Sequence, residues 1–332
     1  MKEKTKDMDN KTLIKSVIIL FILSIIIALQ AIELDYSVYS PGGLINVDER
    51  LSNAQYKSSG SFNMTYVTYR KGSIFNLIIA KLIPTFDIVP NSDITLSNED
   101  MYDIQKRDEI QIKGAISTAT YMAFTKANKD VNLVATNTYI YYIAEGANTN
   151  LKVGDKVLTC DNNTINEAVD VTNCVQSHEM NEDIHMKVLR NNKEVDTVSR
   201  KNEENLIGIV VQAVMDYETD PNITYKREKN ESGSSGGLLL TLSIYNSLVE
   251  EDITKGKKIA GTGTIEYDGS VGAISGVKYK IKGAVKNKVD LFIVPEANYE
   301  EAKQVIEENN FNLKLLKAST FDQVLEDLKS LN

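Results

Sequence analysis

Residues 231–237 read Glu-Ser-Gly-Ser-Ser-Gly-Gly, and residues 238–245 continue as Leu-Leu-Leu-Thr-Leu-Ser-Ile-Tyr. Small residues let a backbone turn sharply, and the apolar run that follows them predicts a buried helix. A serine where such a loop meets a helix lies beside unpaired backbone N–H groups at the positive end of the helix dipole. Because that environment stabilises a developing oxyanion, Ser235 is the candidate nucleophile. The competing interpretation is a flexible linker, of which Gly/Ser-rich runs are typical.

A second motif downstream favours a catalytic loop over a linker. Residues 261–280 read Gly-Thr-Gly-Thr-Ile-Glu-Tyr-Asp-Gly-Ser-Val-Gly-Ala-Ile-Ser-Gly-Val-Lys-Tyr-Lys. Together with the Gly/Ser loop, this motif resembles the proteolytic domain of Lon proteases, and more closely the membrane-anchored bacterial proteases that join a PDZ domain to such a domain. The resemblance implies that Ser235 is the nucleophile, that Thr262 is the threonine of the family's Thr-Gly step, and that Lys280 is the general base.

The chain departs from the family's motifs in a few places. The family often has an acidic residue three positions before the serine, where this chain has Ser232 with Glu231 adjacent. Ser234 and Gly236 stand where the nucleophile motif Pro-Ser-Ala-Gly has Pro and Ala, and Ser275-Gly276 replaces a Gly-Gly step. Because the replacements are small, a similar loop geometry is expected. The departures also motivate an alternative function, in which an inactive proteolytic domain belongs to a PDZ-containing peptide-binding scaffold or assembly factor at the membrane.

A serine–lysine pair can act only if the lysine is neutral, because a charged ammonium cannot take the proton of the serine. Burial lowers the pKa of a lysine, and Thr262 would orient the amine without adding a carboxylate that holds it charged. Lys278 is the alternative base. In a helix that begins near Val277, side chains two positions apart point about 200° apart, so only one of Lys278 and Lys280 can face the serine.

Composition excludes several other classes of protein. The net charge of −9 and the pI near 5.0 argue against nucleic-acid binding. His178 and His185 are the only histidines, and no His-Glu-x-x-His or Cys-x-x-Cys pattern occurs, so no metal or other cofactor is expected. No Gly-x-x-x-x-Gly-Lys-Ser/Thr loop occurs either, which predicts a protease without ATP. Cys160 and Cys174 either form a bridge outside the cell or remain buried thiols.

The N-terminal segment predicts a membrane anchor. Residues 1–15 are rich in lysine, and residues 16–32 are almost wholly apolar. This run is just long enough to be a short transmembrane helix, or else the core of a signal peptide. The lysines before it, with Glu33 and Asp35 after it, predict a cytoplasmic tail at 1–15 and a catalytic region outside the cell. No clean Ala-x-Ala cleavage site follows the run, which favours an uncleaved anchor at the cell membrane.

Two further regions are expected between the anchor and the Gly/Ser loop. Residues 36–129 predict an extracellular α/β region, with Ser73 as the cap of a short helix and a long helix over 99–128 as packing scaffold. Residues 130–203 predict a β-rich, PDZ-like domain, because residues 151–158 resemble the Leu-x-x-Gly-Asp-x-Ile turn and strand of PDZ domains. The Gly-Leu-Gly-Phe type of carboxylate loop is not recognisable; Asn-Thr-Tyr-Ile at 137–140 stands near its position. The region is therefore expected to bind peptide ends or to act as a substrate gate or docking surface.

The resemblance implies that residues 205–332 form a Lon-type α/β proteolytic domain. The predicted fold class is α/β (α+β), with an N-terminal transmembrane helix and a PDZ-like domain inserted before the proteolytic domain. The predicted function is that of a membrane-anchored, extracellular, ATP-independent serine endopeptidase with a Ser-Lys dyad. Its expected substrates are exported peptides, including peptide signals that mature by cleavage, or unfolded segments of secreted proteins. The resemblance leaves a homo-oligomer open, because Lon-like domains often form rings.

Overall fold

The computed structural model describes residues 2–96, 99–228 and 231–331 and their side chains from residue 10 onward. The chain divides into two compact units, one made of Met1–Pro41 and Val67–Ile94 and the other of Gly42–Tyr66 and Thr95–Asn332. Strands β1 (Glu33–Asn46) and β3 (Ser61–Ser73) each contribute to both units.

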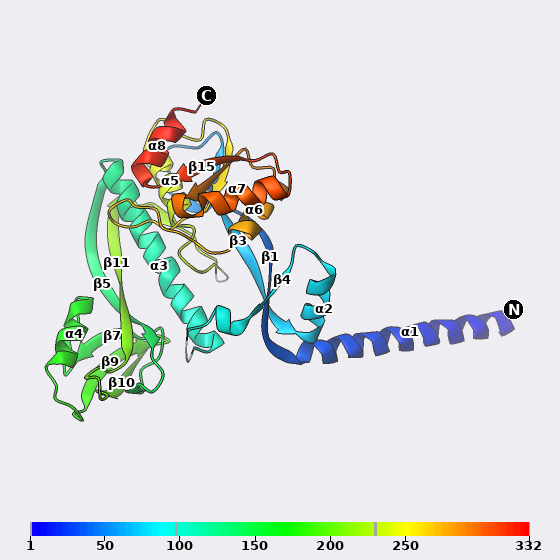
Figure 1. Cartoon of the computed structure of the whole chain (residues 1–332), viewed down its shortest axis with the longest axis horizontal. Helices are drawn as coiled ribbons and strands as arrows, with labels where there is room; N and C mark the ends of the chain where they lie inside the picture. Colours follow the sequence, from blue (N-terminus) through cyan, green and yellow to red (C-terminus); the bar gives the residue numbers. More distant parts are fainter. Residues whose placement is uncertain (1, 97–98, 229–230, 332) are drawn as a thin grey trace. The chain divides into compact units, whose positions relative to one another are not determined.

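The first unit contains the long N-terminal helix α1 (Lys2–Ala31), drawn in dark blue in Figure 1. Its stretch Asn10–Ala31 has a mean hydropathy of 2.7, and none of the stretch is buried. By length and composition this helix could cross a membrane, and a signal sequence near the N-terminus would have the same properties. The helix begins well before the predicted span 16–32, because the charged residues ahead of the apolar run continue the same helix.

The rest of the first unit follows from local sequence signals. The Ser73 hydroxyl accepts the N–H of Asn76 and caps α2 (Ile74–Leu82), as predicted. Ile83 is extended, as expected before Pro84, and ends the helix. β4 (Asp87–Pro90) then pairs antiparallel with Tyr36–Tyr39 of β1, and a 3₁₀ turn follows over Asn91–Asp93.

The second unit is built in part on parallel strands. Residues 61–64 of β3, then β13 (Lys258–Gly261), β14 (Leu291–Pro295) and β15 (Lys314–Ala318) pair in that order, all parallel. Side chains alternate between the faces: Leu291 and Ile293 enter one apolar cluster, and Phe292 and Val294 enter another. A sheet that is apolar on both faces must be covered by helices on both, which is the mixed α/β arrangement expected.

Helices cover both faces of these strands. The cluster that contains Leu291 is completed by residues of the helices α3, α5 and α8, and the cluster that contains Phe292 by residues of α6 and α7. The helix bounds are α3 (Met101–Lys126), α5 (Gly237–Leu248), α6 (Val277–Lys286), α7 (Tyr299–Glu308) and α8 (Phe321–Lys329). Every residue of α5 is buried, as its apolar sequence predicts.

A second sheet in the same unit is antiparallel and has seven strands. The strand order is β11-β5-β7-β9-β10-β6, with β8 paired to β7. Helix α4 (Ala168–Gln176) packs with this sheet around a separate apolar cluster. The strand bounds are β5 (Asp130–Ile143), β6 (Asn148–Thr149), β7 (Lys156–Cys160), β8 (Asn163–Thr164), β9 (Ile184–Arg190), β10 (Lys193–Arg200) and β11 (Ile209–Asp220). This is the region read as PDZ-like from sequence, and that assignment stays a prediction.

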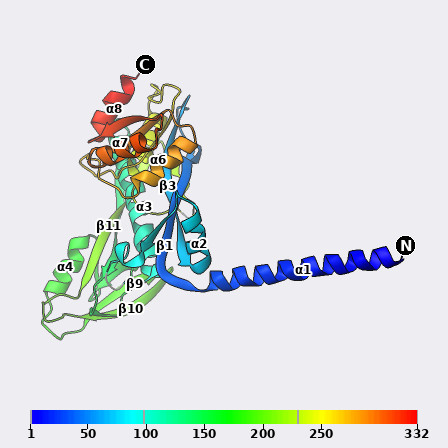
Figure 2. The same ribbon diagram turned by 45° about the vertical axis from the view of Figure 1, so that its right-hand side comes forward.

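Strands β5 and β11 form a long antiparallel pair that runs beside α3. The Ser117 hydroxyl on α3 donates to the carbonyl of Met215 on β11 at 2.7 Å, and Figures 1 and 2 show helix and strands side by side. β11 thus belongs to the antiparallel sheet although its sequence follows the predicted boundary at 203. A short pair, β2 (Leu51–Ser52) with β12 (Thr224–Tyr225), and the 3₁₀ turns Asp48–Arg50 and Glu296–Asn298 complete the unit.

Candidate active site

Ser235 lies in the turn that leads into α5, one residue before the cap of that helix. Gly236 is the N-cap residue, and a Cβ placed there would lie 2.3 Å from the Met64 sulfur. The Ser235 carbonyl accepts the N–H of Gly263 at 2.8 Å, and the N–H of Leu238 donates back to the Gly263 carbonyl at 3.1 Å. These two bonds join the loop to the segment that follows β13. A side chain at 236 would require the Met64 side chain to shift, and the two backbone bonds hold the serine beside it at a defined place.

Lys280 and Thr262 converge on this serine from two other elements. Lys280 on α6 places its Nζ 2.9 Å from Ser235 Oγ and 2.8 Å from Thr262 Oγ1. The Thr262 hydroxyl, at the end of β13, donates to the Ser235 carbonyl at 3.0 Å. The structure thus brings together all three residues that the sequence singled out.

Burial differs among the three side chains in a way that matters chemically. Thr262 is fully buried and Lys280 is 4% exposed, whereas Ser235 is only half-buried. Burial penalises the ammonium form and lowers the pKa of Lys280 from 10.5 to about 7. A lysine with that pKa is substantially neutral near pH 7, so its lone pair can accept the hydroxyl proton of the serine. Ser235, in contrast, remains open to a substrate.

Lys278, the alternative base, occupies a different environment. It is half-buried, and its Nζ lies 5.0 Å from the centre of the Tyr279 ring. Helix α6 begins at Val277, after Gly276 in the left-handed conformation at φ 76°. The helical spacing then turns Lys278 away from Lys280, which is the lysine that meets Ser235.

The acidic residue beside the loop is engaged elsewhere. Glu231 accepts a hydrogen bond from the Tyr225 hydroxyl at 2.8 Å and forms an ion pair with Arg50. The carboxylate therefore has its own partners within the described residues. On the other side of the loop, the N–H of Gly233 donates to the backbone carbonyl of Asp108 on α3 at 3.2 Å. The sequence did not predict this contact between α3 and the loop, because the long helix over 99–128 was expected only to pack as scaffold.

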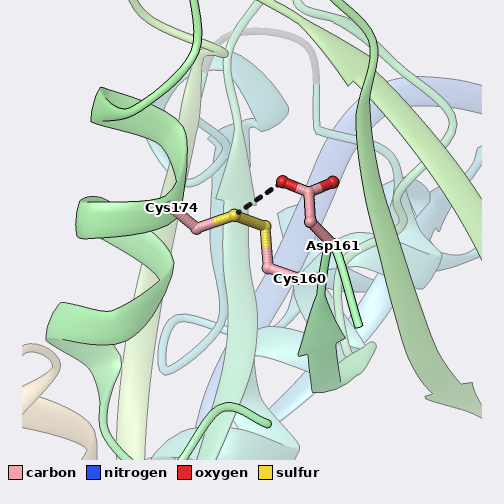
Figure 3. A group of neighbouring side chains, drawn as sticks. All are labelled: Cys160, Asp161 and Cys174. Atoms are coloured by element: carbon pink, nitrogen blue, oxygen red, sulfur yellow. Dashed lines mark hydrogen bonds between the residues drawn. A yellow bond between two sulfur atoms is a disulfide. The ribbon is translucent and has the colours of Figure 1, made fainter. Parts of the chain in front are cut away.

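The residue types that usually make metal or catalytic sites gather elsewhere, around Asp161. Cys160 and Cys174 form a disulfide, and the Cys174 sulfur lies 3.5 Å from an Asp161 carboxylate oxygen (Figure 3). The His178 ring contacts the same carboxylate at 2.9 Å and the Cys174 carbonyl at 2.8 Å. The backbone N–H of His185 donates to the Asp161 carboxylate at 3.2 Å. With both sulfurs bonded to each other, neither offers a thiolate to a metal. The bridge resolves the alternative that the sequence had left open.

Comparisons with known proteins agree with the motif at the Gly/Ser loop. Residues 229–330 match the family model of the Lon protease (S16) C-terminal proteolytic domain. A Lon-type proteolytic domain is present. Lon proteases of Desulfatibacillum aliphaticivorans, Mesomycoplasma hyopneumoniae and Fusobacterium nucleatum are 30%, 28% and 32% identical over 96, 96 and 94 residues. These alignments cover 29%, 29% and 28% of this chain but only 11%, 11% and 12% of the relatives. The similarity to this domain supports a serine-type peptidase.

Proposed function

We propose that the chain is a membrane-anchored serine endopeptidase in which Ser235 is the nucleophile, Lys280 the general base and Thr262 the residue that orients the lysine. The observation that carries the proposal is the 2.9 Å contact between Lys280 Nζ and Ser235 Oγ, made by a lysine that burial drives toward its neutral form. The serine-type peptidase domain at residues 229–330 supports the same assignment.

The geometry supports a two-step hydrolysis. Neutral Lys280 accepts the proton as Ser235 Oγ attacks the scissile carbonyl, and the resulting ammonium gives a proton to the leaving amine. Water, deprotonated by the same lysine, then releases the acyl group and restores the serine. Thr262 keeps the amine in place, because its hydroxyl accepts from Lys280 and donates to the Ser235 carbonyl.

Backbone donors near the serine would stabilise the oxyanion. The N–H of Gly233 donates to the carbonyl of Asp108, and the N–H of Gly237 donates to the carbonyl of Ser234. Within the part of the chain that the structure describes, the N–H groups of Ser235 and Gly236 donate to no protein acceptor. They precede the first turn of α5, where the helix dipole favours negative charge.

The apolar helix α1 and its lysine-rich start support an anchor with the proteolytic domain outside the cell. Substrates would then be exported peptides or unfolded segments of secreted proteins, cleaved without ATP. The antiparallel sheet with α4 would serve as the PDZ-like docking region. All of these assignments go beyond the proteolytic domain itself and belong to the proposal.

The test compares the full-length chain in detergent micelles with its Ser235→Ala and Lys280→Met variants. Each is incubated with an unfolded protein and with peptides from the culture medium of the source cells, and the products are identified by mass spectrometry. We expect new cleavage products from the wild type alone. Peptides that are retained by all three proteins but cut by none would instead establish a binding scaffold.

A further inference from the structure

A cavity of about 290 Å³ adjoins the serine loop. Ser234, the neighbour of Ser235, and Thr264, the neighbour of Gly263, both line it. Gly263 donates its N–H to the Ser235 carbonyl, so both lining residues are direct neighbours of the two residues that this bond joins. Its other wall comes from α3 and from the β5/β11 pair, outside the residues that match the proteolytic domain.

The lining divides into an apolar part and a polar part. The larger share of the lining is polar and includes Tyr141 and Tyr267, and the smaller apolar share comes from the largely buried residues Ala115, Val214 and Ile265. Glu266, which is exposed to solvent, is the single charged residue of the lining, and no Lys, Arg or His contributes to it among the described residues. A long side chain with an apolar stem and a cationic end matches this division, because the stem can pack while the end meets the carboxylate and the tyrosine rings.

The polar wall is held in place before any ligand arrives. The Gln111 amide donates to the Tyr141 hydroxyl at 2.6 Å. The Tyr267 hydroxyl lies 3.1 Å from Ser117 Oγ, and its ring packs edge-on against Tyr121 with ring centres 5.4 Å apart. Side chains fixed in this way lose little conformational entropy when a ligand binds.

We propose that this cavity receives an arginine or lysine side chain of the substrate, next to the scissile bond, with Glu266 as the residue that selects the positive charge. The inference rests on the proposed function and names the substrate class of that site: basic peptides. The net charge of −9 acts in the same direction, because it attracts cationic peptides and repels acidic ones.

The test uses peptides that are identical except for one residue, placed at successive positions around the cut site as arginine, norleucine or glutamate. Norleucine keeps the stem and removes the charge. We expect the full-length wild type to prefer arginine to norleucine about five-fold in kcat/KM at one position and to cut the glutamate peptide least. Glu266→Gln should bring the arginine-to-norleucine ratio close to one, while Glu326→Gln, an exposed glutamate on α8, should leave the ratio unchanged.

A second variant tests the volume of the cavity. Gly114 on α3 lines it, and a Cβ there would lie 3.3 Å from the Gln212 side-chain amide. Gly114→Leu should fill the cavity and lower kcat/KM for the arginine and norleucine peptides alike. Gln105→Leu, on the exposed face of the same helix, should have no such effect.

Binding separates this inference from the catalytic proposal. In the Ser235→Ala background, fluorescence anisotropy measures peptide affinity without any cleavage. A preference for arginine that Glu266→Gln abolishes supports the cavity assignment, even if the wild type were to cut nothing. Equal affinity and equal kcat/KM for arginine and norleucine at every position would overturn the cavity assignment and leave the peptidase proposal standing.

Discussion

Two regions of the second unit differ in the partners that their reactive side chains have. Around Asp161, the two cysteine sulfurs are bonded to each other, and the carboxylate contacts the His178 ring and accepts the backbone N–H of His185. Around Ser235, the partners of a buried lysine among the described residues are two hydroxyls, and burial lowers the pKa of the lysine to about 7. The first region has the residue types usually associated with catalysis. The second region has the group whose charged form is disfavoured by burial, the Lys280 amine. A buried group whose preferred charge state is not stabilised is available to react.

The largest expected effect tests the lysine itself. Lys280→Met should lower kcat/KM for peptide hydrolysis at least about 10³-fold, because it removes the base while filling a similar volume. The fold should survive, since a buried amine is replaced by an apolar side chain. Hydrolysis of a quenched peptide and the melting temperature are the two measurements. Lys278→Met is the matched control, and a large loss there with little loss in Lys280→Met would move the base to Lys278.

The bridge near Asp161 should matter for stability and not for chemistry. Replacing both Cys160 and Cys174 by Ala should lower the free energy of unfolding of that region by about 3 kcal/mol, because the bridge closes a loop of 14 residues. Hydrolysis of a short peptide should stay unchanged. Denaturant unfolding and peptide assays of the double variant measure the two quantities. Loss of hydrolysis in a variant that remains folded would mean that the region around Asp161 takes part in the reaction.

The pH dependence of activity should follow Lys280. Since only the neutral amine is reactive, kcat/KM should fall about ten-fold per pH unit below 7 and level off above it. A profile of the wild type between pH 5 and 9 measures this. A midpoint near 10 would show that the lysine is not desolvated.

The same lowered pKa predicts how stability depends on pH. Between about pH 7 and 10.4 the unfolded chain holds more protons at this lysine than the folded chain does, so its contribution to the free energy of unfolding rises with pH across that window. The penalty for burying the amine is fully present below pH 7. Lys280→Met should lack this contribution, and chemical unfolding of both proteins at several pH values would detect the difference.

The smallest effect concerns the threonine. Thr262→Val removes the hydroxyl that contacts Lys280 and the Ser235 carbonyl, which should lower kcat/KM about five-fold to ten-fold and cost about 1 kcal/mol of stability. Thr197→Val is a matched control, because Thr197 is also buried and donates to a carbonyl, that of Met186 at 2.9 Å. Both variants should lose similar stability, and only Thr262→Val should lose activity. Equal activity in the two would remove Thr262 from the site.

Local sequence signals predicted much of the framework. The Ser73 cap of α2, the long helix α3 and the buried helix α5 were all expected from patterns within a few residues, and all are present. The stretches Asn298 to Glu301 and Thr320 to Gln323 both match a helix-capping pattern, and Thr320 caps α8 as that pattern predicts, by accepting the N–H of Gln323. Asn298 was expected to cap α7, but its side chain bonds to the backbone of Ile274. A partner from a distant loop competes with the local N–H groups, and no pattern around Asn298 reveals it.

By itself, the sequence predicted many of the helices and strands and the apolar N-terminal helix, and it singled out Ser235, Thr262 and Lys280 as candidate site residues, because local spacing and motifs lie within short stretches of chain. Only the tertiary structure decided which groups are buried and which distant residues meet. It buried Lys280 so that desolvation lowers its pKa, joined Cys160 to Cys174, and brought α3 and β11 beside the serine loop to form a cavity. These properties depend on burial and on contacts between residues far apart in sequence, which local patterns do not encode.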